Sequence, residues 1–237
     1  QTLMHAEAAQ TANIVAAQFA RNEAAVAALA EDLRRNPPPF VATCARGSSD
    51  HAATYAKYLI ETQLGVVTAS LSPSIGSVYA SPLRLEGALF IAISQSGKSP
   101  DLLRNAEIAK AGGAHVLALV NVVDSPLAKL ADTVLPPHAG PVNSVAATKS
   151  YLCSLAAQLQ LAARWSGDEK LLAAVAACGS SKGPAAPASS TTPPALHQYI
   201  PVPTNTVAAL LIGCCCVLAN VLMLRSLLNP ATTYSLI

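Results

Sequence analysis

Short apolar runs alternate with longer amphipathic stretches through the middle of the chain. The apolar runs have the length of strands and lie at 40–44, 66–70, 88–93, 116–120 and 133–135. The run at 88–93 is apolar throughout, which is typical of a central strand that is buried on both faces. The stretches between the runs predict helices at 49–64, 74–79, 100–110, 126–130 and 144–165.

This alternation of strands and helices indicates an α/β fold. Crossover connections between parallel strands are right-handed, and in a doubly wound sheet their helices cover both faces. We therefore predict a three-layer, doubly wound, five-stranded parallel sheet, formed by residues 39–166. Residues 1–38 have apolar positions at helical spacing, and a run of three prolines begins at Pro37, so they predict an N-terminal segment of one or two helices.

The C-terminal part of the chain departs from this pattern. Residues 167–205 are rich in Pro, Ser and Ala and predict a linker. Residues 206–237 form an apolar tail of unknown structure, in which the uncharged run 207–224 reaches the lower limit of a membrane span. The tail could be a membrane anchor, a helix packed on the domain or on a dimer partner, or an end unrelated to the rest. The abrupt loss of acidic residues favours the last of these and not membrane contact.

Composition and charge narrow the function classes. A formal net charge of +2 without a Lys/Arg run argues against a nucleic-acid-binding surface, which needs concentrated positive charge. The six cysteines form no C-x-x-C pair, and no secretory signal opens the chain. We therefore expect a cytoplasmic protein without a metal site or a cofactor.

Candidate chemistry gathers in loops that follow the predicted strands. Ligands of doubly wound sheets bind beyond the carboxyl ends of the strands, and this rule selects the loops after Cys44, Ile93 and Leu135. The loop after Ile93 reads Ser94-Gln95-Ser96-Gly97-Lys98-Ser99 and opens a helix. Its hydroxyls, its amide side chain and the unpaired amides at the helix start favour an anion such as phosphate. An ordinary serine-capped loop is the alternative interpretation.

The other two loops have the same ambiguity. Gly47, Ser48 and Ser49 open the helix after Cys44, where a serine could bind an anion or simply cap the helix. Arg46 before them could pair with a phosphate, pair with a carboxylate of a partner subunit, or remain solvated. In the third loop, Lys149 could bind a ligand, or it could be a solvated or structural lysine.

Together these loops resemble the SIS (sugar isomerase) domain of glucosamine-6-phosphate synthase and of related amino-sugar-phosphate isomerases and deaminases. Ser94-Gln95-Ser96-Gly97 and Val145-Ala146-Ala147-Thr148-Lys149 are the stretches that carry the resemblance most specifically. It implies a flavodoxin-like fold in which a serine-rich loop grips the phosphate of a sugar and the second stretch approaches the sugar itself. The substrate-binding residues expected from the loops and the resemblance are Gly47, Ser48, Ser49, Ser94, Gln95, Ser96, Ser99, Val145, Ala147 and Lys149.

Two departures from the family pattern limit the expected activity. The family usually has a glutamate where this chain has Val142, and its enzymes carry a second SIS domain that holds most acid–base residues. No such sequence follows Trp165, so we expect binding of a hexose-6-phosphate or amino-sugar phosphate with weak or no catalysis. A non-catalytic phosphosugar-sensing module and a truncated remnant of a two-domain enzyme are the alternatives. The resemblance also implies a homodimer.

Overall fold

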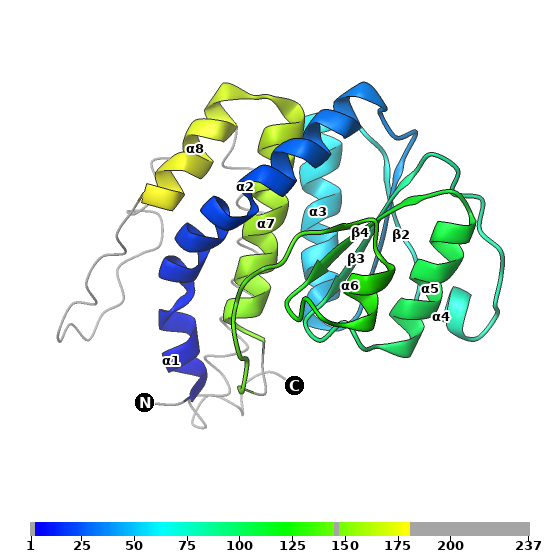
Figure 1. Ribbon diagram of the computed structural model, residues 1–237, viewed down its shortest axis with the longest axis horizontal. Helices are drawn as coiled ribbons and strands as arrows, with labels where there is room; N and C mark the ends of the chain where they lie inside the picture. The colour runs from blue at the N-terminus through cyan, green and yellow to red at the C-terminus, as the bar shows by residue number, and fades with distance from the viewer. Residues whose placement is uncertain (1–2, 145–146, 181–237) are drawn as a thin grey trace, which may run out of the picture. The chain divides into compact units, whose positions relative to one another are not determined.

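The computed structural model describes residues 3–144 and 147–180. Its centre is a sheet of five parallel strands in the order β2-β1-β3-β4-β5 (Figure 1). The strands are β1 Val41–Ala45, β2 Thr68–Ser70, β3 Leu89–Ser94, β4 His115–Val120 and β5 Thr133–Val134. The helices are α1 Leu3–Ala9, α2 Thr11–Arg35, α3 Ser48–Leu64, α4 Ser74–Ser77, α5 Pro100–Ala111, α6 Pro126–Leu130, α7 Lys149–Ser166 and α8 Glu169–Ser180. The predicted three-layer parallel fold is confirmed.

The sheet is buried on both faces because alternate side chains of each strand point to opposite helical layers. Phe90 and Ala92 of β3 pack with Leu102 of α5 and Leu127 of α6 in one hydrophobic core. Ile91, between them, lies on the other face beside α3 and α7. An apolar run without polar alternation is therefore required here, as the sequence indicated.

The N-terminal segment forms two helices, and α2 packs along α7 on the side away from the sheet (Figure 1). Buried amide side chains join these two helices, with Gln18 Nε2 donating to the Cys153 carbonyl at 2.9 Å and Gln160 Nε2 to the Phe19 carbonyl at 2.8 Å. Such bonds give α2 a fixed position along α7, because a sliding movement would leave buried polar groups unpaired.

One helix boundary and part of one predicted linker differ in the structure. Helix α7 begins at Lys149 and not at 144, since the preceding glycine- and proline-containing loop continues at least to Ser144. Helix α8 occupies the first part of the predicted linker 167–205. Its residues Leu171 and Val175 are buried against Phe19, and this apolar contact stabilises a helix whose surrounding composition suggested a linker.

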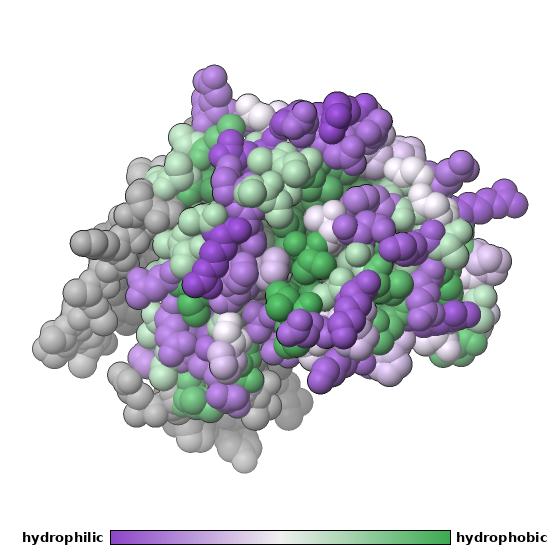
Figure 2. Space-filling model, in the orientation of Figure 1, coloured by the Kyte–Doolittle hydropathy of each residue, from purple (hydrophilic) through white to green (hydrophobic). Residues whose placement is uncertain are grey.

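Polar residues cover much of the face drawn in Figure 2, and apolar residues interrupt them near its centre. Within residues 3–144 and 147–180, no helix combines the length and apolar character needed to cross a membrane. The predicted tail 206–237, with its run 207–224, lies outside the described residues, as does the last part of the predicted linker.

Candidate functional site

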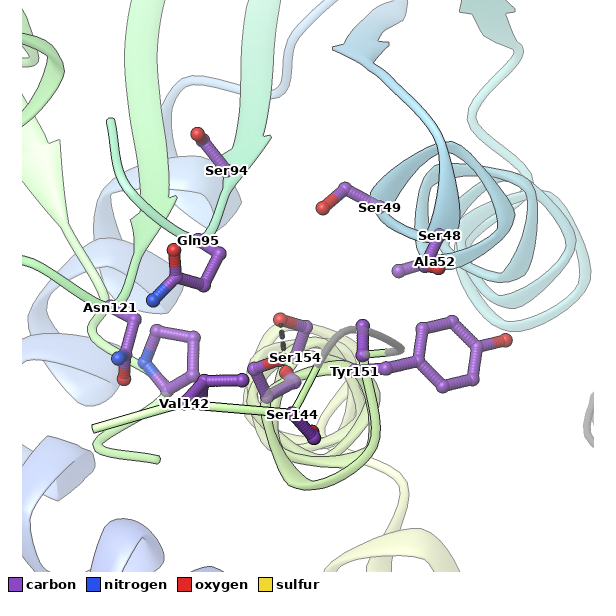
Figure 3. A pocket seen from close by; sticks show the side chains of 13 residues that line it. Ser48, Ser49, Ala52, Ser94, Gln95, Asn121, Val142, Ser144, Tyr151 and Ser154 are labelled. Atoms are coloured by element: carbon purple, nitrogen blue, oxygen red, sulfur yellow. Dashed lines mark hydrogen bonds between the residues drawn. The ribbon is translucent and has the colours of Figure 1, made fainter. Parts of the chain in front are cut away.

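A cavity of about 240 Å³ opens where the loops that follow the strands meet the first turns of α3 and α7. Figure 3 shows Ser49 on one side of this cavity, with Ser94 and Gln95 on the other. The lining consists of six serines, two amides, one tyrosine and four apolar residues: Ser48, Ser49, Ser94, Ser144, Ser150, Ser154, Gln95, Asn121, Tyr151, Ala52, Pro137, Val142 and Ala147. Segments that are far apart in sequence therefore form one polar cavity.

The loop between β3 and α5 is shaped by its own serines. The Ser94 hydroxyl accepts a hydrogen bond from the Gly97 amide at 3.0 Å, which closes a tight turn at the end of β3. Ser99 is the N-cap residue of α5, but its side chain makes no capping hydrogen bond. Ser99 therefore does not cap the start of α5, where Pro100 carries no amide hydrogen and the Leu102 amide donates to the Asp101 carboxylate at 3.0 Å.

The loop between β1 and α3 places its serines inside the helix and not at its cap. Gly47 is the N-cap residue, with φ +58°, a conformation that favours glycine. Ser48 and Ser49 form the first turn of α3 and line the cavity. The capping interpretation of these two serines is therefore wrong, because Gly47 occupies that position.

Arg46 forms an ion pair within the chain. Its guanidinium lies 3.0 Å from a carboxylate oxygen of Asp101 in the first turn of α5. This ion pair joins the loop after β1 to the helix that follows β3. The two serine-bearing loops are consequently tied together beside the cavity.

Helix α7 and the loop after β4 supply side chains that the sequence analysis missed. Ser150, Tyr151 and Ser154 of α7 line the cavity, and the Ser154 hydroxyl donates to the Ser150 carbonyl at 2.9 Å. Asn121 follows β4, donates to the Gly140 carbonyl and accepts from the Ala139 amide, both at 2.8 Å. The rule of strand carboxyl ends could have identified Asn121, and serines four residues apart in an apolar helix could have identified the α7 pair.

The remaining predicted residues fall into three groups. Ala147 lines the cavity, and Val145 lies outside the described residues. Gly47, Ser96 and Ser99 belong to the lining loops without being part of the lining itself. Lys149 is buried and donates from Nζ to Gln10 Oε1 at 3.1 Å, which is the arrangement of a structural lysine.

The cavity is neutral as well as polar. None of the side chains that line it in the described part of the chain is an aspartate, glutamate, lysine, arginine or histidine. The same described residues contain no group of three or more side chains suited to hold a metal ion. Such a lining can donate and accept hydrogen bonds, and the Tyr151 phenol is the titratable group among the lining side chains that the structure describes.

Curated proteins are similar in sequence to about half of this chain. A glutamine–fructose-6-phosphate aminotransferase (isomerizing) from Symbiobacterium thermophilum is 42% identical over 130 residues, which make up 54% of this chain and 21% of that protein. Its counterpart from Zymomonas mobilis is 39% identical over 122 residues, or 52% of this chain and 20% of that protein. The chain therefore spans about a fifth of the length of these curated relatives.

Solved structures of other proteins have a similar fold. A proposed phosphosugar isomerase from Silicibacter pomeroyi DSS-3 has a TM-score of 0.73 at 44% sequence identity, covering 76% of this chain and 55% of that one. The C-terminal domain of glucosamine-fructose-6-phosphate aminotransferase from Francisella tularensis shares the fold, with a TM-score of 0.62 at 22% identity over 75% and 52% of the two chains. Residues 40–164, more than half of the chain, match the SIS domain. The chain belongs to the SIS domain family.

Proposed function

We propose that the chain binds a hexose-6-phosphate or an amino-sugar phosphate in the cavity at the carboxyl edge of the sheet, with weak or no turnover by the described residues. The observation that carries the proposal is the neutral, serine-rich lining, to which several loops contribute. The curated relatives are named as aminotransferases of fructose-6-phosphate, and this supports a phosphorylated sugar as the ligand.

The phosphate is assigned to the start of α5 in this proposal. The positive end of the dipole of this twelve-residue helix attracts an anion, and hydroxyls of the turn that precedes the helix can donate to phosphate oxygens. Gln95 lines the cavity and adds an amide donor, while Ser96 and Ser99 belong to the same turn. Arg46 is already paired with Asp101, so the phosphate is held chiefly by hydrogen bonds from neutral groups.

The sugar is assigned to the side of the cavity that α7 forms. Sugar hydroxyls need both donors and acceptors, and the hydroxyls of Ser150 and Ser154 together with the amide of Asn121 supply both. Ser150 and Ser154 come from α7 and Asn121 from the loop after β4, so these groups differ from the Ser94–Ser99 turn in sequence origin. This division explains why the polar lining extends over more than one loop.

Catalysis has weaker support than binding. Isomerisation of a sugar phosphate moves a proton between adjacent carbons and needs a positioned acid or base. No titrating carboxylate, imidazole or amine lies among the described lining residues. That neutrality favours a non-catalytic phosphosugar-sensing module as the second candidate function, which differs from the first only in turnover.

Calorimetric titration of the full chain with fructose-6-phosphate and glucosamine-6-phosphate tests the proposal, and unphosphorylated fructose and glucosamine serve as ligand controls. We expect binding of at least one phosphate ester and none of the free sugars. Gln95→Ala should weaken binding about tenfold, which corresponds to one lost hydrogen bond to a charged ligand. Ser77→Ala removes a hydroxyl on α4 that donates to the Pro73 carbonyl and does not line the cavity, so the affinity of this variant should match that of the unaltered chain.

Two results would contradict the proposal. Absence of binding to every hexose phosphate tested would remove the ligand assignment. Rapid conversion of fructose-6-phosphate, followed by product chromatography, would refute weak turnover and place acid–base groups elsewhere in the chain. A homodimer and a cytoplasmic location stay predictions, which sedimentation of the purified chain and localisation in cells can test.

A further inference from the structure

A buried carboxylate from the N-terminal helix reaches the loop that closes one side of the cavity. Glu7 of α1 is only 4% exposed. Its Oε1 accepts hydrogen bonds from the backbone amides of Asn143 at 2.7 Å and Ser144 at 3.2 Å, and its Oε2 accepts one from the Ser144 hydroxyl at 2.6 Å. One side chain therefore binds three donors that lie about 136 residues away in sequence.

The residues that Glu7 holds belong to the site. Ser144 lines the cavity, and Figure 3 shows it beside Val142 on the side formed by the loop and α7. Residues 135–144, which lead from β5 to Ser144, contain no helix or strand. Its conformation consequently depends on contacts with other elements, and Glu7 and Asn121 are two residues that bind its backbone amides.

A second contact reinforces the first. Gln10 follows α1 and accepts a hydrogen bond from the buried Lys149 ammonium, the first residue of α7. The positive charge of Lys149 also acts on Glu7, although it contributes less than the hydrogen bonds. The hydrogen bond from the Ser144 hydroxyl, followed by that from the Asn143 amide, keeps the pKa of Glu7 below its ordinary value, so the carboxylate is charged at neutral pH.

We propose that Glu7 is a positioning residue, which fixes Asn143 and Ser144 so that the sugar side of the cavity keeps its shape. This inference rests on the proposed sugar-phosphate binding and assigns the N-terminal helix to the same site. A carboxylate is suited to this role because it accepts several hydrogen bonds at once, and bonds to a charged acceptor are stronger than neutral ones. The phosphate side, formed by the Ser94–Ser99 turn, does not contact Glu7 through any of these bonds.

The test compares two ligands on three variants of the full chain. Glu7→Ala should raise the Kd for the hexose phosphate about tenfold while leaving the Kd for inorganic phosphate unchanged, since the phosphate turn is intact. Glu7→Gln keeps one acceptor oxygen for the two backbone amides, so it should restore part of the affinity. Glu31→Ala, an exposed glutamate on α2, is the matched control and should leave both Kd values unchanged.

Hydrogen exchange of the Asn143 and Ser144 amides provides a measurement that needs no ligand. We expect faster exchange at these two amides in Glu7→Ala, with little change in Glu31→Ala. Unchanged exchange and unchanged hexose phosphate affinity in Glu7→Ala would overturn the proposal. An equal loss of affinity for both ligands would overturn it as well, because it would indicate a general structural effect.

The same experiments separate this inference from the proposed function. If the unaltered chain binds no hexose phosphate, the proposed function fails. The hydrogen-exchange rates of the Asn143 and Ser144 amides then test the role of Glu7 independently of ligand binding. Slow exchange that persists in Glu7→Ala would show that the carboxylate does not hold the loop.

Discussion

Gly97 occupies a tightly constrained position in the Ser94–Ser99 turn, and its substitution tests the geometry of this turn. Its φ is +64°, in the left-handed region that favours glycine. A Cβ atom added here would lie 2.6 Å from Cβ of Ser125 and 2.8 Å from Cγ2 of Val120. The Gly97 carbonyl also accepts from the Leu127 amide at 3.2 Å, which holds the turn against α6.

These contacts determine the expected size of the effect. Placing alanine in the left-handed region costs about 1–2 kcal/mol. Forcing a methyl group into filled space adds about 1–3 kcal/mol, because Val120 and Ser125 are buried and have little room to move. Gly97→Ala should therefore lower the free energy of unfolding by about 2–5 kcal/mol, a large part of the stability of an ordinary domain.

Gly65→Ala is the matched control. Gly65 ends α3, at the opposite end from Ser48 and Ser49, and has φ +67° with no atom within 4 Å of an added Cβ. It should lose only the backbone contribution of about 1–2 kcal/mol and bind hexose phosphate normally. Urea unfolding followed by circular dichroism measures both stabilities, and calorimetry measures binding. Equal losses of stability in the two variants would refute the steric argument.

Three further predictions concern groups around the sheet. Burial, with a smaller contribution from Asp101 and Asp50, raises the pKa of the Cys44 thiol to about 12. Iodoacetamide at pH 8 should therefore not label Cys44 in the native chain, and fast labelling found by peptide mass spectrometry would contradict this prediction. Burial raises the pKa of Asp132, but hydrogen bonds from Lys110 and the Val116 amide outweigh it and leave the pKa below its ordinary 3.8. The ionised Asp132 carboxylate therefore stabilises the folded chain above pH 3.8, and this stabilisation is lost as the pH falls through the lower pKa that Asp132 has in the folded state. Asp132→Asn should lower the free energy of unfolding by about 1 kcal/mol at pH 7 and by progressively less in acid. Urea titrations at several pH values measure this difference. Arg46→Ala should change the free energy of unfolding by less than about 1 kcal/mol, because the arginine of the pair with Asp101 is exposed. The same variant should bind hexose phosphate more weakly in calorimetry. Unchanged binding would show that the ion pair does not position the loops.

Local pattern determined much of the fold. The apolar runs near 88–93 and 116–120 correspond to β3 and β4 within one residue, since strands buried on both faces tolerate few polar side chains. The position of the Ser94–Ser99 turn also followed from sequence, because a strand end, a glycine and a Ser-Pro helix start are local signals. The expectation that Ser49, Ser94 and Gln95 share one cavity needed only the topology of a parallel sheet.

Tertiary packing decided the rest. Helix α8 owes its place to contacts of Leu171 and Val175 with Phe19, a residue about 150 positions away, which no local composition reveals. The burial of Lys149 against Gln10 and the bonds between Glu7 and Ser144 depend equally on where α1 lies. A sequence lists donors and acceptors, but which of them meet depends on chain crossings that bring distant segments within hydrogen-bond distance, and only the folded chain determines those crossings.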